Sequence, residues 1–343
     1  MKVDTMLAVP PAKVAAAAAD AERSGLDGVW LPEVKHDAFI GVALASRTTE
    51  RIALATGIAV AFGRTPMTVA QQANDLQAVT EGRLVLGLGS QIKAHITRRY
   101  DMPWSRPAAR MREFVLAMRA IWTAWSEGGK LDFQGEIYSN TLMSPMFVPE
   151  PHGFGAPTVI IAGVGPLMTE VAGEVADGLL AHSFTTREYL ENVTVPALAR
   201  GTARAADAGR STTLVGAPFI ALGNDEPERA AAVAKLRHQV AFYASTPAYR
   251  PVLEQHGWEA LGDRLHALSR SREWEQMAGL VDDTMLDAFV ISGTPVEAAA
   301  RIQTRYGTLF DRISPVTTDT TDPKLVGELA AAVRELTSSV EPV

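Results

Sequence analysis

The sequence contains no cysteine among its 343 residues. This absence excludes disulfide bonds, thiolate metal ligands and a cysteine nucleophile. Other templates are missing as well: there is no GxxxxGK[ST] phosphate loop, no HExxH zinc motif and no GxSxG nucleophile elbow. No close trio of histidines and carboxylates resembles a metal site. Serine-based and metal-based hydrolysis are therefore disfavoured, and no metal is expected.

Clustered basic residues and long apolar runs are also scarce. The formal net charge is −7, and the longest basic run is Arg98-Arg99. Nucleic-acid binding needs clustered Lys and Arg to neutralise phosphates, so no nucleic-acid partner is expected. No apolar run approaches the roughly 18 residues of a membrane-spanning helix. Met1 to Val9 reads as a strand and not as a secretory signal. The sequence therefore predicts a cytoplasmic protein without a membrane partner.

Short apolar strand patterns alternate with helical patterns along most of the chain. Parallel pairing through right-handed crossovers is the topology that such alternation favours. The sequence predicts an α/β fold, a (β/α)8 TIM barrel that spans residues 1–315. The expected strands are Val3–Val9, Gly28–Leu31, Ile52–Val60, Leu84–Leu88, Thr158–Ala162, Gly178–Ala181, Leu214–Leu222 and Ala288–Ser292, and the clearest helices are Ala12–Ser24, Met67–Val79, Ala108–Trp125 and Pro166–Ala176.

Two segments interrupt this rhythm. Residues 101–156 contain a long helix and a candidate hairpin, LDFQG/EIYSN, and residues 244–287 are rich in Trp, His and Arg. We expect both to be insertions over the carboxyl-terminal face of the barrel, where they would shape the substrate pocket. Residues 316–343 are expected to form a C-terminal tail with a last helix near Lys324–Leu336.

Polar residues follow several of the predicted strands, at the face where barrels bind their ligands. His36, His95 and His182 come after strands two, four and six, and Glu33 comes directly after strand two. Paired titratable groups can divide acid and base duties. His36, together with Glu33 or His95, is therefore the candidate for proton transfer. The alternative for each histidine is a structural or surface role, and for Glu33 a capping or ion-pairing role.

Glycines stand at the ends of three predicted strands. Gly57 and the GLGS segment 87–90 would let a flat ligand approach the backbone closely. Gly163 and Gly165 join the fifth strand to a helix N-terminus, whose N–H groups can hold a phosphate. Met168 replaces the third glycine of GxGxxG, so this is not a dinucleotide fingerprint. A tight turn without a ligand is the alternative.

These motifs resemble the luciferase-like flavin or deazaflavin oxidoreductases, a bacterial family of (β/α) barrels. The resemblance covers nearly all of the first 315 residues. It is densest in GVWLPEVKHDAF, TGIAVAFGRTPMTVAQQANDL, GRLVLGLGSQIKAHITRRYDMPWSRPAARMREFVLAMRAIW and AGVGPLMTEVAGEVADG. These strings look like the actinobacterial subgroup presumed to use the deazaflavin coenzyme F420.

The resemblance implies where a cofactor would bind. In the family the ring packs against a bulge in strand three that carries a non-proline cis peptide, which maps onto Gly57-Ile58. Several deazaflavin dehydrogenases have an Asp-His pair after strand two, whereas this chain has Glu33-Val34 and, later, His36. The implied cofactor contacts are Gly57, Ile58, Ala59, Gly89, Ser90, Gln91, Gly163, Val164, Gly165, Pro166 and His182.

Three functions follow as hypotheses. The first is an oxidoreductase that transfers a hydride between coenzyme F420 and a small organic substrate. The second is an FMN-dependent monooxygenase that uses dioxygen at the same ring site. The third is a non-catalytic barrel that acts as a binding or assembly protein. The resemblance is also compatible with a homodimer.

Overall fold

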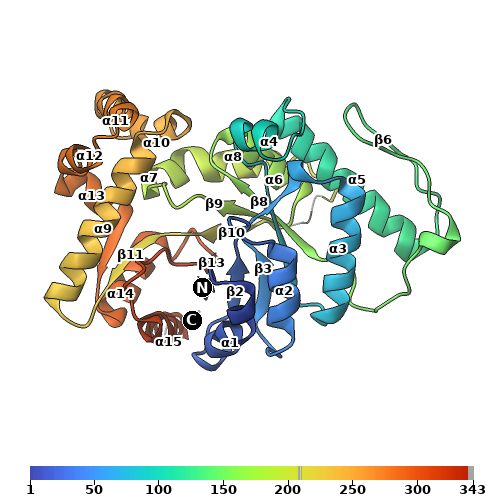
Figure 1. Cartoon of the computed structure of the whole chain (residues 1–343), viewed down its shortest axis with the longest axis horizontal. Helices are drawn as coiled ribbons and strands as arrows, with labels where there is room; N and C mark the ends of the chain where they lie inside the picture. The colour runs from blue at the N-terminus through green and yellow to red at the C-terminus, as the bar shows by residue number, and fades with distance from the viewer. Residues whose placement is uncertain (208, 210, 339–343) are drawn as a thin grey trace.

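The computed structural model of the protein describes residues 1–207, 209 and 211–338. Its centre is a closed ring of eight parallel strands surrounded by helices (Figure 1). The predicted (β/α)8 barrel is confirmed. In ring order the strands are β1 (Lys2–Met6), β2 (Gly28–Leu31), β3 (Ala53–Thr56), β5 (Leu84–Gly89), β8 (Thr158–Gly163), β9 (Gly178–Ala181), β10 (Thr213–Gly216) and β13 (Arg312–Ile313). The short β4 (Ala59–Val60) continues the third strand after a break and pairs with β5.

The helices between these strands begin where the sequence favours a helix start. Pro66, Pro107 and Pro166 each stand at the first helical position, where proline costs no hydrogen bond. The four helices expected from the sequence are present as α1, α3, α5 and α6. The helices that surround the ring are α1 (Pro11–Arg23), α2 (Ala38–Ser46), α3 (Pro66–Val79), α5 (Pro107–Glu127), α6 (Pro166–Val175), α8 (Val195–Thr202), α14 (Pro295–Tyr306) and α15 (Pro323–Ser338).

The seventh strand expected from the sequence is divided in two. Residues 214–222 form β10 and a separate β11 (Phe219–Leu222), with Pro218 between them. Proline has no N–H to donate to a ladder, which accounts for the break at this point.

The eighth strand was predicted in the wrong place. The segment expected there, Ala288–Ser292, ends a helix and begins β12 (Val290–Gly293), which pairs with β11 and not with the ring. The eighth place in the barrel belongs to β13, between β1 and β10. With only two residues, β13 has no alternating pattern that the sequence could reveal.

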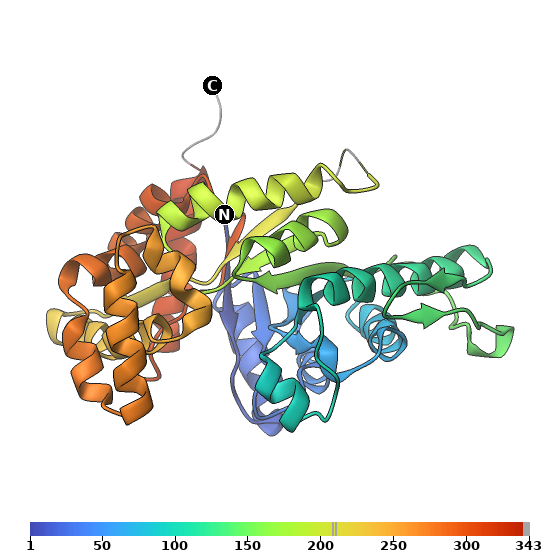
Figure 2. The same cartoon turned by 90° about the horizontal axis from the view of Figure 1, so that it is seen from above.

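The hydrophobic core has two main parts. The larger lies between the barrel wall and its helices, and it includes Leu329 and Val333 of α15. The smaller belongs to a lobe beside the barrel, coloured yellow to orange in Figure 2. This lobe is made of β11, β12, α9 (Glu226–Ala244), α10 (Arg250–Glu254), α11 (Glu259–Ser271), α12 (Trp274–Leu280) and α13 (Asp283–Phe289).

The segment 101–156 is mostly the long helix α5 and the predicted hairpin, which is confirmed as β6 (Phe133–Gln134) and β7 (Ser139–Asn140). The hairpin turn rests on α5, where the Glu113 carboxylate accepts hydrogen bonds from the N–H of Ile137 at 2.8 Å and of Tyr138 at 3.2 Å. Figure 2 shows the hairpin on the side of the barrel away from the lobe.

The barrel interior is filled by side chains. Trp30 packs with small and branched residues of the neighbouring strands. Its indole N–H donates to the buried carboxylate of Asp4 at 2.8 Å, and Asp4 also pairs with Arg312. The residues of this interior cluster are Trp30, Ala55, Val85, Ile160, Leu180 and Val215. Because the interior is packed, ligands must bind at the ends of the strands. Among the described residues, no helix is both long and apolar enough to cross a bilayer.

Candidate active site

At the carboxyl-terminal mouth of the barrel, the end of the third strand presents partly exposed backbone beside β5. The peptide between Gly57 and Ile58 is cis, as the family resemblance predicts. A Cβ atom on Gly57 would lie 2.9 Å from the Cβ of Trp30, and one on Gly87 would lie 2.0 Å from the carbonyl oxygen of Thr56. Only glycine fits at these contacts, because the place of each Cβ is already taken by Trp30 or by the backbone of β3. Gly87 is buried, whereas Gly57 and Ile58 are partly exposed at the mouth, and we call their backbone the backbone wall.

Glu33 is the hub of a buried network beside this wall. Its carboxylate accepts hydrogen bonds from the Val60 N–H at 2.8 Å, from Arg64 at 2.8 Å and 2.9 Å, and from the Tyr100 hydroxyl at 3.1 Å. Arg64 also donates to Asp37 at 2.7 Å. These contacts fix β4 to the loop after β2. They match the ion-pairing role that the sequence left open for Glu33, while its role in proton transfer stays a prediction.

The two candidate histidines on this side of the mouth are exposed. His36 lines a pocket of about 310 Å³ between the starts of α1 and α2, together with Leu7, Pro32 and other residues. His95 lies on α4 (Lys93–Arg98), with Nδ1 3.2 Å from the Gln91 side-chain oxygen. The described hydrogen bonds do not join His36, His95 and Glu33 to one another. Their two loops do meet, because Arg99 donates to the carbonyl of Val34 at 3.0 Å.

His182 lies three strands from the cis peptide, on the inner side of the barrel, two residues beyond the interior residue Leu180. The Phe184 N–H donates to its Nδ1 at 3.0 Å. Its Nε2 is 3.1 Å from the hydroxyl oxygen of Tyr249, which comes from the lobe. Burial lowers the pKa of His182 to about 4, so the imidazole is neutral near pH 7.

The loop after β8 leads into the N-terminus of α6, where the sequence predicts phosphate binding. Gly165 is the N-cap of α6, and a Cβ atom there would meet nothing within 4 Å. The Tyr189 hydroxyl donates to the carbonyl of Val164 at 3.1 Å and holds the loop. A groove of about 640 Å³ lies between the first turns of α5 and α6. Apart from Arg106 this groove is lined by apolar groups, and the feature that would attract a phosphate is the helix N-terminus, with its unpaired N–H groups and positive partial charge.

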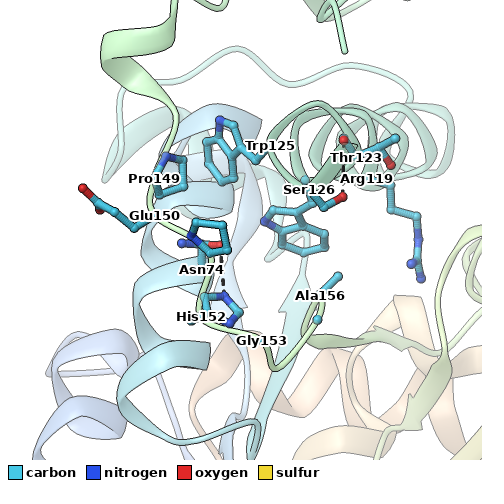
Figure 3. Close-up of a pocket in the computed structure, with 13 residues that line it drawn as sticks. Asn74, Arg119, Thr123, Trp125, Ser126, Pro149, Glu150, His152, Gly153 and Ala156 are labelled. Atoms are coloured by element: carbon cyan, nitrogen blue, oxygen red, sulfur yellow. Dashed lines mark hydrogen bonds between the residues drawn. The ribbon is translucent and has the colours of Figure 1, made fainter. Parts of the chain in front are cut away.

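Figure 3 shows the residues that line a further pocket, of about 410 Å³. It is lined by Asn74 of α3, Trp125 near the end of α5 and His152, whose Nε2 is 3.2 Å from Asn74 Oδ1. Its loop packs where β5 begins, since Phe154 contacts Gly82. No loop from the carboxyl-terminal mouth lines this pocket, so we place the candidate site at the mouth.

Arg64, Tyr100 and Tyr249 are the site residues that sequence reasoning missed as functional. For Tyr249 there was one weak indication in the sequence, because it is an aromatic residue in the segment 244–287, which is expected to shape the substrate pocket. Arg64 and Tyr100 carried none, because their partner Glu33 is 31 and 67 residues away in the sequence. Within the part of the chain that the structure describes, no group of three or more His, Asp or Glu residues could hold a metal ion.

Comparisons with known proteins show the family of this chain. The family model of the luciferase-like monooxygenases matches residues 2–312. An uncharacterised protein of Mycobacterium tuberculosis (strain H37Rv) is 49% identical, over 92% of this chain and 93% of its own. The F420-dependent glucose-6-phosphate dehydrogenase of Nocardia farcinica is 34% identical, over 56% of this chain and 58% of its own.

A similar solved structure is the coenzyme F420-dependent tetrahydromethanopterin reductase of Methanopyrus kandleri. It superposes with a TM-score of 0.77 at 21% identity, over 97% of this chain and 96% of that one. The chain belongs to the luciferase-like monooxygenase family, as the resemblance in its motifs predicts. It is accordingly an oxidoreductase.

Proposed function

We propose that this protein is an oxidoreductase that binds coenzyme F420 at the barrel mouth and acts on a small organic substrate. The observation that carries the proposal is the partly exposed backbone wall at Gly57 and Ile58, with the open N-terminus of α6 at Gly165 on the same face of the barrel. The F420 dependence of the Nocardia relative and of the Methanopyrus structure supports the choice of cofactor.

The residues present fit both ends of such a cofactor. Gly57, Ile58 and Ala59, together with the adjacent 89–91 segment of Gly, Ser and Gln, would line one side of the ring. The loop from Gly163 to Pro166 would hold the phosphate through backbone N–H groups. When bound, the deazaflavin supplies hydride transfer, and the protein supplies position and exclusion of water.

Proton exchange in this proposal belongs to His36, with His95 or Glu33 as its partner. His36 and His95 are both exposed at the rim of the mouth, where they can exchange protons with solvent. Glu33 is already paired with Arg64 and holds β4 in place. We therefore favour His95 as the partner and assign Glu33 a positioning role.

A binding titration tests the cofactor. Purified protein is titrated with F420 and with FMN under identical conditions, and binding is followed by fluorescence quenching. We expect tight binding of F420 and weak binding of FMN. Binding of neither compound contradicts the proposal and favours a non-catalytic barrel.

An FMN-dependent monooxygenase is the second candidate, because the same backbone wall and the N-terminus of α6 would also hold the ring and phosphate of flavin mononucleotide. The family's name also supports it. Preference for FMN in the titration, followed by substrate-coupled uptake of dioxygen, would establish this candidate. Homodimer formation and a cytoplasmic location are further proposals, tested by sedimentation velocity and by cell fractionation.

A further inference from the structure

Tyr249 brings a hydroxyl group from the lobe to the mouth of the barrel. It ends the 3₁₀ turn Pro247–Tyr249, between α9 and α10. Its ring stacks on the imidazole of His182, with centroids 4.6 Å apart and planes 23° apart. Tyr249 and His182 are both partly exposed. His182 follows β9, so the pair lies at the same carboxyl-terminal face of the barrel as the proposed ring site.

The hydrogen bonds around His182 determine where the protons lie. Because the Phe184 N–H donates to Nδ1, this nitrogen is an acceptor and the neutral imidazole carries its proton on Nε2. Nε2 must then donate to the Tyr249 hydroxyl oxygen, 3.1 Å away. The hydroxyl oxygen is an acceptor in this bond, so its own proton points to a different partner.

No second partner for the Tyr249 hydroxyl is recorded among the described residues, so the proton is left for a ligand at the mouth. Burial raises the pKa of Tyr249 to about 12, which keeps the hydroxyl protonated and makes it a hydrogen-bond donor near pH 7.

The rings that contact this donor and His182 are aromatic. Tyr243 meets the imidazole edge to face at 4.9 Å, and Phe184 lies 5.7 Å from the Tyr249 ring. Burial alone, without a neighbouring charge, shifts the pKa of His182. A charged ligand would lack a counter-ion here, whereas an apolar or aromatic body would pack well.

We propose that Tyr249 recognises the substrate by donating a hydrogen bond to a carbonyl or hydroxyl oxygen on an uncharged, aromatic or apolar molecule. His182 is the positioning residue that directs this hydroxyl. The inference rests on the proposed function, because it places the substrate beside the proposed ring site. It assigns His182, one of the implied cofactor contacts, to the substrate side.

Two matched probes test the recognition. Acetophenone carries a carbonyl oxygen, and ethylbenzene has the same body without it. Their affinities for the full-length protein are measured by ligand-observed NMR, with and without F420. We expect the wild type to prefer acetophenone. Tyr249→Phe should weaken acetophenone binding by a factor of about 3 to 10, the contribution of one neutral hydrogen bond, and leave ethylbenzene unchanged.

The matched control is Tyr243→Phe, which removes a hydroxyl from the neighbouring ring and should change neither affinity. His182→Asn tests the positioning role, since an Asn oxygen can still accept from the Phe184 N–H. It should weaken acetophenone binding in the wild-type background and have no further effect in Tyr249→Phe, because both changes remove one interaction.

The proposal is overturned if the wild type shows no preference for acetophenone, or if Tyr249→Phe leaves that preference intact. Equal losses in Tyr243→Phe and Tyr249→Phe would also overturn it, because they would indicate general disruption of the aromatic packing. Fluorescence quenching by F420 is read on the same samples. A failure of the proposed function therefore appears as lost F420 binding, separately from the ratio of the two probe affinities.

Discussion

At the residue scale, the buried ion pair between Glu33 and Arg64 holds the mouth together. Their side chains are only 7% and 13% exposed. Arg64→Met would leave the Glu33 carboxylate buried without its cation, and we expect the free energy of unfolding to fall by about 3 kcal/mol. Urea denaturation measures this loss. Arg23→Met is the control, because its pair with Asp20 is exposed and should contribute little. Equal effects of the two variants would contradict the argument.

His182 gives a second prediction at this scale. Its pKa falls from 6.5 to about 4 through burial, so between these values the unfolded chain binds more protons than the folded chain. Stability therefore decreases as the pH drops through this window. His182→Asn removes the titration. The wild type should lose up to about 3 kcal/mol relative to this variant between pH 7 and pH 4, measured by urea denaturation at each pH. Parallel pH profiles for the two proteins would argue against a buried neutral imidazole.

Some of these residues could be located from the sequence and others could not. The positions of Gly57 and His182 at the mouth follow from counting strands, because strand ends lie at one face of a barrel. The pairing of His182 with Tyr249 spans 67 residues and depends on how the lobe packs. No local periodicity encodes such a contact, so sequence reasoning identified the histidine and not its partner.

At the scale of single elements, phosphate binding at the N-terminus of α6 can be tested by introducing a negative charge there. Gly165 has an extended backbone, with φ of −82°, and open space at its Cβ position, so a side chain fits there. Gly165→Asp places a negative charge beside the proposed phosphate, whereas Gly165→Asn has the same shape and no charge. Both residues cap helices well. We expect Asp to weaken F420 binding at least tenfold relative to Asn.

Fluorescence titration of the two variants measures the difference, and thermal unfolding checks that both remain folded. Equal affinities of the Asp and Asn variants for F420 would mean that the phosphate lies elsewhere. The comparison is informative because a steric effect of the new side chain would appear in both variants, and an electrostatic effect only in the Asp variant.

Some helices and strands could be predicted from local sequence patterns, and others could not. Long periodic helices such as α3 and α5 were predicted within a few residues, because their apolar faces and N-terminal prolines are local signals. The place of β13 in the barrel was not predicted. One of its two residues, Arg312, forms an ion pair with the buried Asp4. The strand therefore has a charged residue where a hydrophobic pattern would need an apolar one, and such a pattern cannot reveal it.

At the scale of the whole molecule, the candidate site is made of two parts, and each part packs against a different hydrophobic core. The backbone wall and the proposed phosphate site at the N-terminus of α6 belong to the barrel, whereas Tyr249 packs against the second core, in the lobe. The described links between lobe and mouth include the Tyr249–His182 hydrogen bond and the bridge from Phe219 to Val316. We infer that the barrel holds the cofactor and the lobe selects the substrate.

This division predicts that damage to one core leaves the function of the other intact. Leu265, on α11, and Leu84, at the start of β5, are both buried, one in each core. Replacing either by Ala should cost about 2–5 kcal/mol. Hydrogen exchange should then quicken mainly in α9 to α13 for Leu265→Ala, with F420 affinity unchanged, and in the barrel strands for Leu84→Ala. Faster exchange throughout the barrel in Leu265→Ala would show instead that the two cores unfold as one unit, and substrate selection could then not be separated from cofactor binding.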